Sequence, residues 1–159
     1  MSARIGIIAC VALAAMTGLV RAQDQAPRYL NPPSLPPATG YTHVVVAPDG
    51  RTVYVAGQIA LDSTGRLVGA GDFRAQAEQV YANLRRALAS VGGSLADLVK
   101  TTTFITDVAQ VAVLREVRGR YLDAQHPPAN SLIPVATLAR ADLLIEIEAV
   151  AILRNPARP

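Results

Sequence analysis

Two glutamates near the end of the chain, Glu146 and Glu148, lie two positions apart within the segment LIEIEAVA, residues 144–151. In a β-strand, residues i and i+2 project from the same face. The pattern therefore predicts a strand with both carboxylates on one face and apolar side chains on the other. Because an unpaired carboxylate is costly to bury, each glutamate should be solvated, paired with a cation or part of a functional site.

The elements that must position these carboxylates can be predicted from periodicity. A helix begins at the N-cap Asp72, repeats apolar residues at a spacing of 3.6 and stops at Gly92-Gly93. A second helix is predicted from Asp107 to the residues before Pro127. Alternation and β-branched residues predict strands, with turns between them, at 42–47, 52–57, 98–106, 130–138 and 143–152.

This order of elements predicts an α+β fold. With one further short strand near the turn at 62–65, the pattern gives a six-stranded mixed sheet and only two amphipathic helices. Two helices packed together cover one face of such a sheet, so the other face needs a partner. We therefore expect an oligomer that buries the open face.

Length and composition are those of one folded domain with a leader. Of the 159 residues, 51% are hydrophobic and 17% are charged, which excludes a disordered chain. Residues 1–22 resemble a cleavable signal peptide: Arg4 precedes an uncharged run, and Val20-Arg21-Ala22 offers a cleavage site after Ala22. An uncleaved anchor and a lipoprotein modified at Cys10 remain alternatives. The mature protein is expected in the periplasm or secreted, with no membrane contact after the leader is removed.

Cleavage would also change the charge of the chain. The formal net charge is +3, and removal of two arginines with the leader leaves about +1. With no basic run and no tryptophan, nucleic-acid binding has little support. Residues 23–40 contain five prolines and predict an extended arm, followed by a domain at 41–154 and a short tail at 155–159.

Other motifs that could carry chemistry are weak. Gly69-Ala70-Gly71 is a lone G-x-G and is more typical of a turn than of a phosphate cradle. His43 and His126 are 83 residues apart with no carboxylate-rich spacing around them. No G-x-S-x-G nucleophile motif is present. We expect neither a metal nor a cofactor.

Four segments taken in order carry a more specific pattern: GYTHVVV, VYVAGQIALDSTGRLVGAGDFRAQAEQVYANLRRAL, LVKTTTFITD and IEIEAVA. Together they resemble the Rid family (reactive-intermediate deaminase, RidA or YjgF) from about Tyr41 to Ile152. The resemblance implies a chorismate-mutase-like fold, a homotrimer and small-molecule clefts between subunits. It also implies hydrolysis of an imine to a ketone and ammonia.

The resemblance assigns roles to four positions. Glu146 would position the catalytic water, and Tyr41 and Gly57 would line the pocket and help to hold the ligand. The family's "PAR-S" stretch, whose arginine grips the substrate carboxylate, reads Pro128-Ala129-Asn130-Ser131 here, so Asn130 replaces that arginine. Two smaller departures are Leu132, where a cysteine is frequent, and Ala56, where the family has serine.

An amide at position 130 carries no charge, so the grip on a carboxylate should weaken by about 2 kcal/mol, or roughly thirtyfold. A second arginine, such as Arg51 or Arg140, could compensate. The sequence therefore favours a Rid-family protein with altered specificity for imine- or enamine-like small molecules. The alternatives are a standard 2-iminobutanoate-type deaminase, a non-enzymatic ligand-binding or holdase-like trimer and, more weakly, a ribonuclease. The role of Glu148 stays open.

Overall fold

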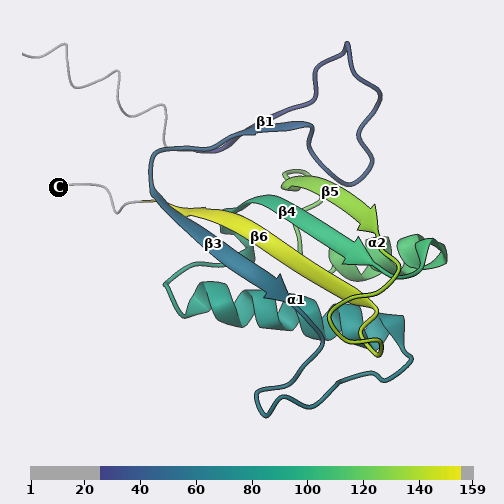
Figure 1. The fold of residues 1–159 in the computed structure, drawn as a ribbon. Helices are drawn as coiled ribbons and strands as arrows, with labels where there is room; N and C mark the ends of the chain where they lie inside the picture. Colours follow the sequence, from purple (N-terminus) through teal and green to yellow (C-terminus); the bar gives the residue numbers. More distant parts are fainter. Residues whose placement is uncertain (1–25, 155–159) are drawn as a thin grey trace, which may run out of the picture.

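The structure, a computed structural model, describes residues 26–154 as a mixed sheet with two helices on one face (Figure 1). The predicted signal peptide (1–22) and the tail (155–159) lie outside the described residues. The α+β class expected from the sequence is confirmed, and the arrangement leaves the second face of the sheet without a helix layer.

Four strands form the main sheet in the order β3-β6-β4-β5. Their bounds are β3 Arg51–Gln58, β4 Leu98–Ile105, β5 Ala129–Pro134 and β6 Ile145–Leu153. The central strand β6 pairs antiparallel with both neighbours, whereas β4 and β5 are parallel. The strand that carries both glutamates thus lies inside the sheet, where its register is fixed from two sides.

The core lies between the sheet and the helices α1 (Phe73–Ala89) and α2 (Val111–Gly119). Asp72 caps α1 as predicted, since its carboxylate accepts a hydrogen bond of 3.1 Å from the backbone N–H of Ala75. Alternate residues of β6 point into this core, which also takes the apolar stripes of both helices: Phe73, Ala77, Val80, Tyr81, Leu84, Leu88, Leu114, Val117, Ile145, Ile147, Ala149 and Ala151.

The N-terminal segment departs from the sequence prediction. The segment 23–40 was expected to form only an extended arm, yet in its described part β1 (Arg28–Leu30) pairs antiparallel with β2 (Val44–Val46) in a separate two-stranded sheet. The predicted strand 42–47 therefore joins the arm instead of the main sheet (Figure 1). Strand propensity marks a segment as extended but does not choose its partner, which is why a six-stranded sheet was expected.

Other elements are shorter than predicted. The extra strand expected near 62–65 is reduced to an isolated bridge between Leu61 and Leu67. Asp107 caps a short 3-10 turn, Val108–Gln110, before α2 begins. Strand β5 ends at Pro134 instead of Leu138, although the next backbone N–H, that of Val135, still donates to the carbonyl of Ile105 at 2.9 Å.

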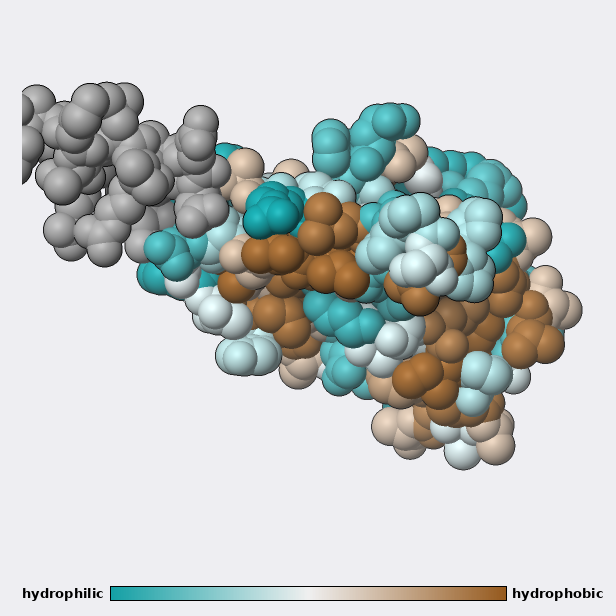
Figure 2. Space-filling model, turned by 90° about the horizontal axis from the view of Figure 1, so that it is seen from above, coloured by the Kyte–Doolittle hydropathy of each residue, from teal (hydrophilic) through white to brown (hydrophobic). Residues whose placement is uncertain are grey.

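The side of the sheet away from α1 has both hydrophobic and hydrophilic side chains on its surface. The view from above shows hydrophobic patches there, interrupted by hydrophilic side chains (Figure 2). Tyr54 of β3 is 80% exposed, and Ile133 of β5 is 38% exposed. We call this side the open face.

Candidate functional site

Glu146 lies on the open face of β6, directly over a bulge in β3. Ala149 pairs with Val55, but Ile147 pairs with Gln58, so β3 has one extra residue at Ala56-Gly57. A Cβ built on Gly57 would lie 1.8 Å from Oε1 of Glu146. Only glycine leaves room for the carboxylate here, and bulges of this kind often aim side chains at functional sites.

The surroundings of Glu146 offer it no charge partner. It pairs across the strands with Phe104 of β4 and is partly buried. Among residues 26–154, no hydrogen bond or ion pair to its carboxylate is present. A partly buried and unpaired carboxylate is unfavourable for stability, which is the expected property of a group kept for a ligand or for a partner subunit.

Glu148 lies on the same face as Glu146, as the i, i+2 spacing predicts, but it is exposed. It pairs across the strands with Thr102 and lines a shallow cavity of ≈ 420 Å³ together with Lys100 and Tyr54. Burial lowers the pKa of Lys100, and the charge of Glu148 opposes that change. The Lys100 ammonium donates a hydrogen bond of 2.7 Å to Oγ of Ser131.

Tyr41 and Asn130 lie together, at the β5 edge of the sheet. They line two adjoining cavities, of ≈ 520 and ≈ 280 Å³. The amide Nδ2 of Asn130 donates to Oγ1 of Thr101 at 2.8 Å and to Oγ1 of Thr103 at 3.1 Å. Both N–H groups of the amide are thus engaged within the chain, and among the described residues its carbonyl oxygen has no hydrogen-bond partner.

The four predicted site residues form two pairs on opposite faces of the sheet. Asn130 pairs with Thr101, whose side chain is buried on the helix side. Glu146 pairs with Phe104 and points to the open face. Within one chain, therefore, Gly57 and Glu146 are brought together, and Tyr41 and Asn130 are brought together, but the two pairs do not meet.

A buried amide fixes the start of β6. Nε2 of Gln76 donates to the carbonyl of Asp142 at 2.8 Å, and its Oε1 accepts from the backbone N–H of Leu144 at 2.8 Å. Leu144 immediately precedes the strand that carries Glu146, so Gln76 helps to set the register of the carboxylate. The sequence contained a sign of this role, because Gln76 is a polar residue within the apolar stripe of α1.

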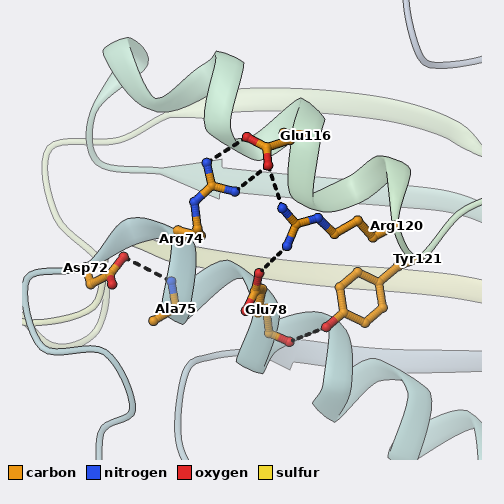
Figure 3. Close-up of polar contacts among 7 residues, drawn as sticks. All are labelled: Asp72, Arg74, Ala75, Glu78, Glu116, Arg120 and Tyr121. Atoms are coloured by element: carbon orange, nitrogen blue, oxygen red, sulfur yellow. Dashed lines mark hydrogen bonds and ion pairs between the residues drawn. The ribbon is translucent and has the colours of Figure 1, made fainter.

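The helix layer behind the site is joined by an ion-pair network between α1 and α2 (Figure 3). Arg74 donates two hydrogen bonds of 2.7 Å to the carboxylate of Glu116. Arg120 joins Glu116 to Glu78 through a contact of 2.8 Å to the latter, and the Tyr121 hydroxyl donates to the Glu78 carbonyl at 3.4 Å. Every carboxylate of this network has an arginine partner.

The arginines suggested as replacements for the missing cation are both elsewhere. Arg140 pairs with Asp142, with an Nε–Oδ1 distance of 3.0 Å. Arg51 lies at the far end of β3 and approaches the carbonyl of Val91 at 3.5 Å. Neither lines the cavities at Tyr41 and Asn130. Arg118, for which the sequence predicted no role, lines the smaller of these cavities.

His43 and His126 have local roles in the structure. Nε2 of His43 lies 2.8 Å from the carbonyl of Pro36, and Nδ1 of His126 lies 2.9 Å from Oδ2 of Asp123. Between residues 26 and 154, no group of three or more potential ligands that could hold a metal ion is found. In the same part of the chain, no helix combines the length and apolar character needed to span a bilayer.

Comparisons with known proteins agree on the family. The model of the family described as Endoribonuclease L-PSP matches residues 32–153. A RutC family protein of Synechocystis is 38% identical over 74% of this chain and 90% of its own length. The human 2-iminobutanoate/2-iminopropanoate deaminase is 33% identical over 86% of this chain and 93% of its own length.

A solved structure gives the same result. The Rid-family protein YyfB of Yersinia pestis superposes with a TM-score of 0.74 at 39% identity, covering 80% of this chain and 98% of that one. The fold and these matches define the class, a mixed-sheet Rid-type domain. The chain belongs to the Rid family, as its sequence pattern indicated.

Proposed function

We propose that this protein hydrolyses a C=N bond in a small imine- or enamine-like molecule, with Glu146 as the base that positions the attacking water. The observation that carries the proposal is the unpaired Glu146 carboxylate held over the Gly57 bulge. Hydrolysis of an imine requires a water near the carbon of the C=N bond and a base within about 3 Å of that water. A relative of this chain is named as a deaminase of 2-iminobutanoate and 2-iminopropanoate.

The geometry supports a site shared between subunits. Glu146 and Asn130 lie on opposite faces of one sheet, so a single chain does not place both around one small ligand. A second copy could bring its open face to the edge that carries Tyr41 and Asn130. We propose a homotrimer on this basis and on the family pattern; sedimentation should give a mass near three mature chains, and a stable monomer would contradict it.

The specificity should differ from that of a site anchored by an arginine on β5. Asn130 has no charge, and its two N–H groups already bond to Thr101 and Thr103. The carbonyl oxygen that remains can accept a hydrogen bond from an amine, imine or hydroxyl group. The ligand at this position should therefore carry a donor, and any carboxylate must be held by another residue.

Glu146→Gln tests the catalytic role. Imine generated from an amino acid by an oxidase is the substrate, and release of the oxo acid is measured. Loss of general-base catalysis should reduce kcat by roughly 10²- to 10⁴-fold. Glu148→Gln is the matched control, because it removes the same charge two positions away on the same face, and it should keep most of the activity.

The two possible failures have different meanings. Equal activity of Glu146→Gln and the native protein would exclude this glutamate as the base. Native protein that binds small oxo acids without any turnover would favour the ligand-binding alternative.

We also propose export through the leader at 1–22. N-terminal sequencing of the mature protein from a periplasmic or culture fraction should begin at Gln23. Intact Met1 in the cytosolic fraction would contradict the proposal.

A further inference from the structure

A cavity of ≈ 280 Å³ lies between α2, the edge strand β5 and the segment before β2. Its lining includes Tyr41, Asn130, Leu132, Arg115 and Arg118. The volume suits a small metabolite of a few heavy atoms and lies just below the usual range for ligand pockets, roughly 300–1,000 Å³. Two arginines and an amide thus line the cavity that holds the predicted ligand residues Tyr41 and Asn130.

Arg118 is the residue in this lining that most needs a partner. It occupies a position of α2 four residues after the buried Leu114, on the apolar side of the helix, and it is partly buried. Within the described chain, 26–154, no carboxylate pairs with Arg118 and no acceptor is hydrogen-bonded to it. This contrasts with Arg74 and Arg120, each of which contacts a glutamate.

Local packing holds this guanidinium in place. Gly40 has a φ of +72°, and a Cβ built there would lie 2.0 Å from Nη2 of Arg118. The backbone at Gly40 thus lies close to the Nη2 end of the guanidinium, just before the pocket residue Tyr41. Burial lowers the pKa of Arg118, the nearby Tyr81 hydroxyl opposes that change, and the charge of Arg115 acts in the same direction as burial.

We infer that Arg118 is the anion anchor of this protein and that the cavity takes a small carboxylate with a hydrogen-bond donor. The carboxylate would bind the Arg118 guanidinium through charge-assisted hydrogen bonds. The donor, an amino, imino or hydroxyl group, would bind the free carbonyl oxygen of Asn130. This inference rests on the proposed function, because it names the residue of this chain that would hold a carboxylate at that site.

The inference accounts for the substitution at position 130. Asn130 lacks a charge, but a cation reaches the same cavity from α2 instead of β5. The amide is then free to accept a hydrogen bond, which an arginine at this position could not do because a guanidinium has no acceptor. The ligand would be held in a different orientation at its carboxylate end.

The test compares a charged ligand with its neutral counterpart. The probes are 2-hydroxybutanoate and 2-hydroxybutanamide, which both carry a hydroxyl donor and differ in charge but hardly in size; binding to the full-length mature protein is measured by NMR titration. Arg118→Gln should weaken 2-hydroxybutanoate binding by roughly tenfold to a hundredfold. The same change should leave 2-hydroxybutanamide binding unaltered.

Two further variants show whether an effect comes from the Arg118 guanidinium itself or only from the loss of a positive charge. Arg85→Gln removes an equal charge from an exposed position of α1 outside the cavity and should bind both probes as the native protein does. Arg118→Lys keeps the charge but not the two-pronged donor geometry, and it should recover part of the affinity. Native mass spectrometry and circular dichroism report whether each variant keeps its assembly and fold.

The results separate this inference from the proposed function. Equal 2-hydroxybutanoate affinity in native protein and Arg118→Gln, or no measurable binding to the native protein, would overturn the inference. Arg118-dependent binding without turnover would leave the inference standing and overturn the catalytic proposal alone.

Discussion

The two sides of the sheet differ in how their charged side chains are paired. On the helix side, Glu116 is shared by Arg74 and Arg120, and each group of the network has a partner (Figure 3). On the open face, Glu146 and Glu148 have no hydrogen-bond or ion-pair partner among the described residues. Both sides carry glutamates of the same small domain, so residue type alone does not explain the difference in pairing.

This contrast separates charges that stabilise the fold of one chain from charges that have no partner within it. Charges that serve the fold are paired within the chain, because a group that is partly buried alone costs stability. Glu146 over the Gly57 bulge and Arg118 at the α2 edge differ, because they are partly buried and have neither a hydrogen-bond nor an ion-pair partner among the described residues. Their signs are those needed to position a water and to hold a carboxylate, respectively.

The largest effect is expected from a substitution that fills the space next to the Glu146 carboxylate. In Gly57→Ala the added methyl would lie 1.8 Å from the present position of Oε1, so the carboxylate must move. A displacement of about 1 Å can cost roughly a hundredfold in rate. We expect kcat for imine hydrolysis to fall by that order, measured with the oxidase-coupled assay.

Gly119→Ala provides the control for Gly57→Ala. Nothing lies within 4 Å of a Cβ built on Gly119, at the end of α2. Activity should stay unchanged there. Full activity in Gly57→Ala would show that the bulge does not position the catalytic group.

A second change tests the proposal that the open face forms a subunit interface. Tyr54 is 80% exposed on this face, and aromatic residues buried in interfaces often contribute 2 kcal/mol or more. Tyr54→Asp should weaken trimer association by roughly thirtyfold, measured by sedimentation at several concentrations. Val108→Asp, at a residue that is 62% exposed outside the main sheet, should not change the mass.

An unchanged association constant in Tyr54→Asp would place the subunit contact elsewhere. The open face would then be free for another occupant.

The smallest effect is expected in the helix layer, where the charges are already paired. Hydrogen bonds from Arg74 and Arg120 hold the pKa of Glu116 below that of a free glutamate, with Arg74 the larger cause. A lowered pKa in the folded state gives stability that is present near neutral pH and is lost as the pH falls through the folded-state pKa. Glu116→Gln should therefore lower Tm at pH 7 by at most about 4 °C.

The pH dependence makes the Glu116 prediction specific. The Tm difference between Glu116→Gln and the native protein should shrink in acid and at high salt, since exposed ion pairs are screened. Imine hydrolysis should not change. A difference that is the same at all pH values would show that packing, and not charge, links the two helices.

The sequence by itself determined the parts that depend on local periodicity. The i, i+2 spacing placed Glu146 and Glu148 on one face, and the 3.6-residue stripe and Asp72 defined α1 and its start. The ordered segments from Tyr41 to Ile152 indicated the family. These features depend on side-chain direction and capping, which neighbouring residues fix.

Tertiary structure alone decided the pairings between distant segments. It paired β2 with β1 instead of β3, and it inserted the bulge that brings Gly57 to Glu146. It also turned both N–H groups of Asn130 toward Thr101 and Thr103, and it brought Arg118 to the same cavity from a helix. Each of these depends on which surfaces meet once the core has closed, and no local pattern encodes that choice.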